Sequence, residues 1–91
     1  MSIVITKLDG RHAGHIIFSH RAEITGTWIE RDQEFVLIRE WCWETFGPGV
    51  ERDLVHTKKD TKWGWHLNQS PSKHYIYLRD ECLTHFTLKW K

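Results

Sequence analysis

The sequence predicts an α+β fold: a small, mainly antiparallel sheet of the ferredoxin-like or split β-α-β type, with one main helix packed on one face. Three observations support this prediction. The length of 91 residues leaves room for a single domain spanning residues 1–91. Hydrophobic residues make up 40% of the chain and charged residues 27%, which is typical of a folded protein. Short segments of alternating apolar and polar residues recur, and one longer segment repeats its apolar residues every three or four positions.

The N-terminal quarter of the chain favours extended structure. Residues 3–8 begin with three consecutive β-branched residues and predict a strand, which a loop with two glycines at 9–14 ends. A second extended region is expected over 15–25, with an interruption near residues 19–20. Residues 1–20 form either a hairpin of the sheet or a less regular N-terminal extension.

The main helix is predicted over residues 32–46. Acidic and capping residues at 32–34 favour a helix start, and Gly47 and Pro48 favour a stop. The apolar residues between them recur at intervals of three and four positions, which places them on one side of a helix. They are Phe35, Ile38, Cys42 and Phe46.

The second half of the chain reads mostly as strands and turns. Alternating apolar residues and high β propensity predict strands, and polar clusters with proline or charged residues predict the turns between them. The expected segments are a strand within 50–57, a turn at 58–61, a strand at 63–67, a loop at 68–72, a strand at 74–78, a short helical turn from Asp80 and a final strand at 86–90.

One cation of the predicted helix faces its apolar side. At about 100° per residue, Arg39 projects on the same side as the buried stripe and therefore needs a partner. One interpretation is a structural arginine that meets a carboxylate at the sheet rim, such as Asp80 or Glu81. The other is a site for an anion or for a carboxylate of a binding partner.

The same helix is too apolar for a helix with only one packed face. Trp41 and Trp43 fall on opposite flanks of the buried stripe, and Val36 adds to the apolar surface. Either another part of the chain covers a flank, or a flank is an interface for another molecule. Six Trp residues in so short a chain are consistent with both, because Trp serves as a core residue and as a binding anchor.

The motifs of enzymes and of metal sites are missing or incomplete. No phosphate-binding loop, nucleophile elbow or recognised Cys-His nucleophile pair occurs, so we expect no enzymatic activity and no cofactor. His12, His15 and His20 lie close together in sequence and could hold zinc with a further ligand, but loop histidines without a cysteine pair are more often plain surface residues, so we expect no metal site. Cys42 and Cys82 show no CxxC spacing and are expected to be reduced thiols.

A role in nucleic-acid binding is the alternative to protein binding. The formal net charge of +1 argues against it, but residues 58–91 carry seven basic and three acidic residues, a local balance of +4. Aromatic side chains on a sheet can stack bases. The candidate residues for such a site are Lys58, Lys59, Trp63, Tyr75 and Arg79.

Segments of the last two-thirds of the chain resemble small uncharacterised proteins encoded by tailed bacteriophages. They are Arg39–Pro48 (REWCWETFGP), Lys62–Trp65 (KWGW), Tyr75–Leu78 (YIYL) and Phe86–Trp90 (FTLKW). The resemblance implies a protein made in the bacterial cytoplasm, either an accessory factor that binds a host protein or a minor virion component. It carries no established activity over to this chain.

Taken together, these features predict a non-enzymatic protein-binding module. No apolar run approaches the length that spans a bilayer, so we expect no membrane partner. The predicted partner-binding residues are Val36, Arg39, Trp41 and Trp43, with Trp43 as the main anchor. The identity of the partner and the oligomeric state are left open.

Overall fold

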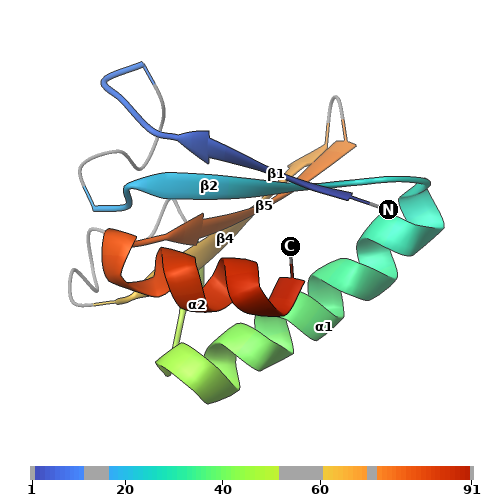
Figure 1. Cartoon of the computed structure of the whole chain (residues 1–91). Helices are drawn as coiled ribbons and strands as arrows, with labels where there is room; N and C mark the ends of the chain where they lie inside the picture. Colours follow the sequence, from blue (N-terminus) through green and yellow to red (C-terminus); the bar gives the residue numbers. More distant parts are fainter. Residues whose placement is uncertain (1, 12–16, 52–60, 70–71, 91) are drawn as a thin grey trace.

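A computed structural model describes residues 2–11, 17–51, 61–69 and 72–90, and in these ranges the chain forms five strands and two helices (Figure 1). Their bounds are β1 (Ser2–Lys7), β2 (His20–Thr25), α1 (Trp28–Phe46), β3 (Val50–Glu51), β4 (Trp63–Gln69), β5 (Ser72–Leu78) and α2 (Asp80–Trp90). Within the described ranges, neither helix is long and apolar enough to cross a membrane.

The strands form one sheet in the order β1-β2-β5-β4-β3. All neighbouring pairs are antiparallel except β3 and β4, which are parallel. It follows from these pairings that β2 and β3 run in the same direction with β5 and β4 between them. The unit β2-α1-β3 is therefore a split β-α-β unit, and the predicted α+β class with a mainly antiparallel sheet is confirmed.

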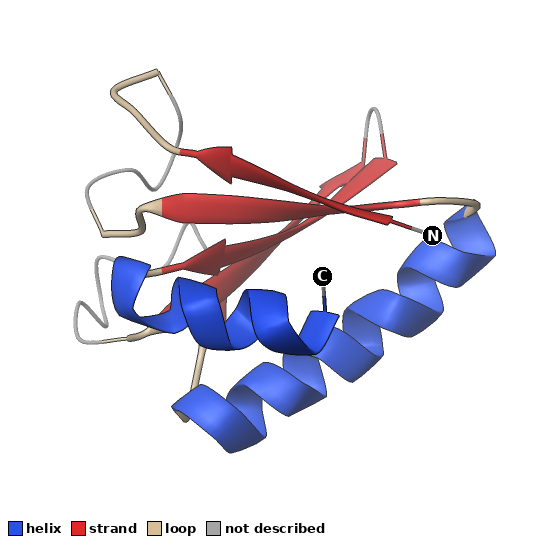
Figure 2. Cartoon of the chain, in the orientation of Figure 1, coloured by secondary structure: helices blue, strands red, loops and turns tan. Residues whose placement is uncertain are grey.

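Both helices lie on the same face of the sheet (Figure 2). Alternate strand residues face them, because side chains of a strand point to opposite sides in turn. Ala22 and Ile24 of β2 and Ile76 and Leu78 of β5 are buried on this face. They pack in one core with the helix residues Phe35, Ile38, Cys42, Cys82 and Phe86.

The helix α1 begins earlier than the sequence predicted. Its N-cap is Thr27, whose hydroxyl accepts a hydrogen bond from the backbone N–H of Glu30 at 3.3 Å. The predicted end is confirmed: Gly47 has a φ of 94°, which favours glycine, and its N–H donates to the Trp43 carbonyl. The predicted start at residue 32 was wrong, because the cap at Thr27 lets residues 28–31 form the first turn of the helix.

The C-terminal segment is a helix, so the predicted strand at 86–90 was wrong. Phe86, Leu88 and Trp90 alternate as in a strand, but Cys82, Phe86 and Trp90 are also four residues apart, as on one side of a helix. The helical spacing prevails because Cys82 and Phe86 are buried against the sheet while Leu88 is 82% exposed. The predicted helical turn at Asp80 is the first turn of this helix.

The other face of the sheet carries a second, smaller core. Leu8 and Phe18, which flank the connection between β1 and β2, pack on Tyr75 and Tyr77 of β5. The backbone N–H of Leu8 donates to the carbonyl of Ser19 and closes the base of this connection. β1 itself pairs with β2 along its full length, as in the hairpin considered for the N-terminal segment.

Some expected segments fall outside the described residues. The strand expected within 50–57 is described only as β3 at Val50–Glu51, and its remainder lies outside. The same holds for most of the turn at 58–61, including Lys58 and Lys59, and for His12 and His15.

Candidate functional site

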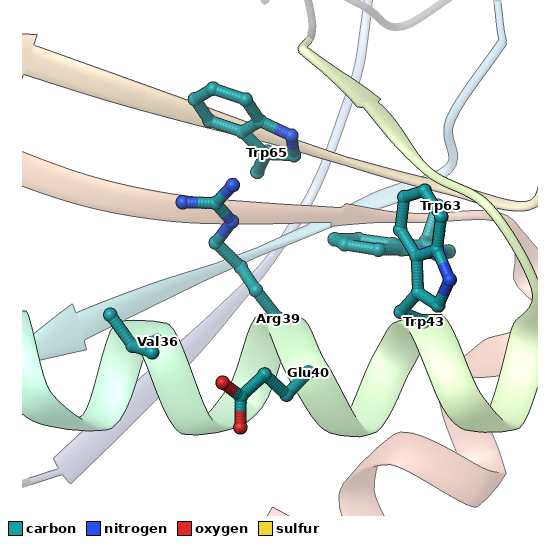
Figure 3. Close-up of a pocket in the computed structure, with 6 residues that line it drawn as sticks. All are labelled: Val36, Arg39, Glu40, Trp43, Trp63 and Trp65. Carbon is teal, nitrogen blue, oxygen red and sulfur yellow. The ribbon is translucent and has the colours of Figure 1, made fainter.

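A pocket of about 280 Å³ opens between one flank of α1 and the adjacent strand β4 (Figure 3). The other lining residues of α1 follow Val36 at three, four and seven positions, so they lie on one flank of the helix. On β4 they are two positions apart and share the face that carries the helices. The lining residues are Val36, Arg39, Glu40, Trp43, Trp63 and Trp65.

Trp63 forms a rigid part of this pocket. Its side chain is only 1% exposed, and its indole Nε1–H donates to the carbonyl of Gly47 at 2.8 Å. The backbone of Gly49 lies directly against the ring, because a Cβ atom added there would approach the indole Cε2 to 2.3 Å. The chain that leaves α1 therefore holds Trp63 in one position.

Arg39 is the cation of the pocket. Its Cζ lies 4.2 Å from the ring centroid of Trp65 and 5.3 Å from that of Phe35, which is cation–π geometry. Burial lowers the pKa of the Arg39 guanidinium, but an arginine remains protonated at neutral pH. No described carboxylate lies within salt-bridge distance of Arg39.

The two carboxylates suggested by the sequence as structural partners, Asp80 and Glu81, therefore form no ion pair with Arg39. Asp80 and Glu81 form the first turn of α2, and the Asp80 carboxylate lies 4.0 Å from His20 Nδ1 instead. The expectation of a pair between Arg39 and Asp80 or Glu81 was wrong, because residues 80–81 begin a helix at the end of β5 rather than lying at the rim beside α1.

The two flanks of α1 differ in what covers them. Trp43 is 55% exposed and Val36 51% exposed, and Ile29, another seven residues back, continues the same exposed stripe. Leu67 of β4 is also 42% exposed on the helix side of the sheet. No described part of the chain covers this flank, which is the situation that the sequence associated with an interface.

Trp41 lies on the other flank and belongs to the interior. Its ring makes edge-to-face contacts with Phe46, His85, Phe86 and Trp90, with centroid distances of 5.3 to 6.2 Å. The structure therefore separates Trp41 from Val36, Arg39 and Trp43 and corrects its assignment to the partner-binding surface. Trp41 is separated from these residues because α2 packs against its flank of α1.

Of the residues predicted to bind nucleic acid, the two described aromatic ones lie on opposite faces of the sheet. Trp63 is buried on the helix face, whereas Tyr75 is 6% exposed and lies on the opposite face, where the Arg21 guanidinium stacks on it at 4.6 Å. Arg79 donates from Nε to the carbonyl of Thr61 at 2.7 Å. Because neither ring is accessible for stacking, the predicted use of Trp63 and Tyr75 to bind bases was wrong.

Three described histidines have polar partners within the fold. His74 Nε2 contacts the Asp32 carboxylate at 2.7 Å, His66 contacts Glu51, and His20 contacts the Ser19 hydroxyl. Among the described residues, no three or more histidines, cysteines or acids are grouped so that they could hold a metal ion.

Both cysteines are free and buried, as expected for reduced thiols. Burial, with a smaller contribution from Cys82, raises the pKa of the Cys42 thiol to about 12. Burial also raises the pKa of the Cys82 thiol. Neither cysteine is therefore a ready nucleophile.

Sequence reasoning missed two walls of the pocket. Trp65 and Glu40 line the pocket but were not among the predicted site residues. The sequence does contain the helical spacing of Glu40 relative to Val36 and Trp43, but not the side of α1 on which β4 lies. The side of α1 that meets β4 depends on the strand order of the sheet, in which β4 lies between β5 and the short edge strand β3.

Comparison of the chain with models of protein families, with curated protein sequences and with solved structures finds no match.

Proposed function

We propose that this protein is a non-enzymatic binding module that holds a protein partner against the pocket between α1 and β4. The observation that carries the proposal is the exposed pair Val36 and Trp43 beside the unpaired cation Arg39. In keeping with the resemblance described above, we propose the role of a bacteriophage accessory protein, which binds a host factor or takes part in the virion.

The chemistry of these residues supports protein binding. Trp and Arg are the residue types that most often dominate the binding energy of protein interfaces. A half-exposed Trp has apolar surface left to bury, and burial of apolar surface contributes about 25 cal/mol per Å². The rigid Trp63 behind it means that little conformational entropy is lost when a partner docks.

Two features weigh against the other classes of function. Among the described residues, the pocket lining offers one carboxylate and one guanidinium but no histidine, cysteine, serine or threonine, so these residues supply no nucleophile with an adjacent base. A nucleic-acid site is disfavoured by the net charge of +1 and by the burial of Trp63 and Tyr75.

The test is an affinity purification from bacterial lysate with nuclease present, comparing the wild-type protein with Trp43→Ala and with Leu88→Ala. Leu88 is the matched control because it is a large apolar residue, 82% exposed, on α2 rather than at the pocket. We expect a protein that is retained by the wild type and by Leu88→Ala but not by Trp43→Ala. Since Trp43 is 55% exposed, its replacement should cost less free energy of unfolding than the about 3–5 kcal/mol typical of a fully buried Trp.

Other outcomes contradict the proposal. Retention of the same proteins by Trp43→Ala would show that the pocket is not the interface. Partners that disappear whenever nuclease is added would instead favour nucleic-acid binding. A large drop in melting temperature for Trp43→Ala would show that this side chain supports the fold rather than an interface.

A further inference from the structure

The guanidinium of Arg39 has hydrogen-bonding capacity that the fold does not use. No hydrogen bond or ion pair joins its side chain to the described residues, and none of its nitrogens is both buried and unpaired, so they reach solvent in the pocket. Figure 3 shows the side chain extending from α1 toward Trp65, while the Glu40 carboxylate points away from it. The aromatic contacts hold the guanidinium in place and leave its N–H donors open.

The open donors favour a single carboxylate over a phosphate. The guanidinium presents a planar fork of N–H groups that matches a carboxylate in a bidentate pair. Arg39 is the one cation among the six lining residues, and Glu40 contributes a negative charge at the rim. A doubly charged phosphate would therefore have one positive partner and one repelling neighbour, whereas a singly charged carboxylate is balanced by Arg39 alone.

The rest of the pocket favours an apolar side chain next to that carboxylate. Val36, Trp43, Trp63 and Trp65 form its other walls. Its volume of about 280 Å³ is just below the range of roughly 300–1,000 Å³ typical of sites for drug-sized molecules. This space suits an aliphatic side chain of a peptide better than a complete small-molecule ligand.

The position of the pocket in the fold favours a side-chain carboxylate over the end of a chain. Proteins that capture a terminal carboxylate use free backbone N–H groups of turns or nests. The six lining residues here lie within α1 and β4, where backbone N–H groups serve the helix and the sheet. The carboxylate would therefore be recognised by the Arg39 side chain alone.

We propose that the pocket recognises a segment of a protein partner in which an Asp or Glu side chain neighbours a bulky aliphatic side chain. The carboxylate pairs with the guanidinium of Arg39, and the aliphatic group fills the space between Val36, Trp43 and Trp65. This inference rests on the proposed function and adds the chemistry of the partner to it.

The test is a titration of the ¹⁵N-labelled full chain with two blocked dipeptides, acetyl-Glu-Leu-amide and acetyl-Gln-Leu-amide, followed by NMR. The two probes have nearly the same shape and differ in the charge that Arg39 would bind. We expect both to shift the indole N–H signals of Trp43 and Trp65, and the Glu peptide to bind about tenfold or more tightly, the range of a charge-assisted pair. The Arg39 Nε–H signal should move with the Glu peptide only.

Three variants separate the ionic contribution from the apolar one. Arg39→Gln should abolish the preference for the Glu peptide while leaving the weaker binding of the Gln peptide. Trp43→Ala should weaken binding of both peptides and keep their ratio, and Leu88→Ala should bind both as the wild type does. Arg39→Lys keeps the charge without the planar fork and should show a reduced preference, which provides a second variant if Arg39→Gln does not fold.

Several results would overturn the inference. Equal affinity for the two peptides, or a preference that survives in Arg39→Gln, would show that Arg39 does not bind the carboxylate. Tighter binding of acetyl-leucine would indicate a site for a chain end, and tighter binding of inorganic phosphate would indicate a general anion site. A lysate partner lost with Trp43→Ala but fully retained by Arg39→Gln would refute this inference while leaving the proposed function intact.

Discussion

Replacing Gly49 by alanine should destabilise the fold by wedging a methyl group against Trp63. The added Cβ would lie 2.3, 2.5 and 2.7 Å from three atoms of the indole, whereas ordinary contacts are 3.4 Å or longer. The ring would therefore have to move by about 1 Å in an interior packed as densely as an organic crystal. Overpacking of this kind costs about 1–3 kcal/mol.

The displacement has a second cost. A shift of that size would lengthen the 2.8 Å hydrogen bond from the indole Nε1–H to the Gly47 carbonyl beyond bonding distance. A buried donor without a partner costs about 1–3 kcal/mol, so the sum is about 2–6 kcal/mol of the roughly 5–15 kcal/mol that stabilises a typical protein. For a chain of 91 residues this lowers the melting temperature by about 10 °C or more.

The assay is equilibrium unfolding by urea and by heat, followed by circular dichroism and tryptophan fluorescence. Gly10→Ala is the matched control, because nothing lies within 4 Å of a Cβ added at that exposed glycine, and it should unfold within about 0.5 kcal/mol of the wild type. In a Trp63→Phe background the smaller ring leaves room, so Gly49→Ala should cost less than in the wild type. A cost below about 0.5 kcal/mol in the wild type, or an equal cost in both backgrounds, would refute the steric argument.

Two further predictions concern the cap of α1 and the buried thiols. Thr27→Ala removes the hydroxyl that accepts from the Glu30 N–H at 3.3 Å and should cost about 0.5–1 kcal/mol in urea unfolding. Thr84→Ala, at an exposed position inside α2, should be neutral within about 0.5 kcal/mol, and equal effects of the two variants would contradict the cap. The pKa of Cys42 is raised from 9.0 to about 12, so the folded state keeps the proton and stability is lost as pH rises above 9. Between about pH 8.5 and 10.5 the wild type should therefore lose about 2 kcal/mol more than Cys42→Ala, at about 1.4 kcal/mol per pKa unit, and parallel curves would contradict the burial of this thiol.

Local sequence signals predicted the elements that local physics controls. The end of α1 follows from Gly47, and the stripe of Phe35, Ile38 and Cys42 is buried as its helical spacing predicts. The start of α1 and the identity of α2 were predicted less well. Residues 86–90 fit the period of a strand as well as that of a helix, and only the burial of Cys82 and Phe86 decides between them.

The residues of the candidate site were likewise predicted only in part from the sequence. Sequence reasoning identified Val36, Arg39 and Trp43, because an apolar stripe and a cation on one flank of a helix are visible from spacing alone. It placed Trp41 with them, because two flanks with similar composition look equally exposed before their neighbours are known. The contact of Trp41 with His85 and Trp90 depends on a helix more than forty residues away in the chain.

By itself, the sequence determined the fold class, the helix that carries the site and the side chains on its exposed flank. These properties depend on periodicity, capping and turn chemistry, which act over a few neighbouring residues. Only the tertiary structure decided which flank α2 covers, that Trp63 faces the interior, and that Arg39 lies over Trp65 with no described carboxylate within salt-bridge distance. Those properties depend on strand order and helix packing, which bring together residues that are distant in the chain and whose pairing no local pattern encodes.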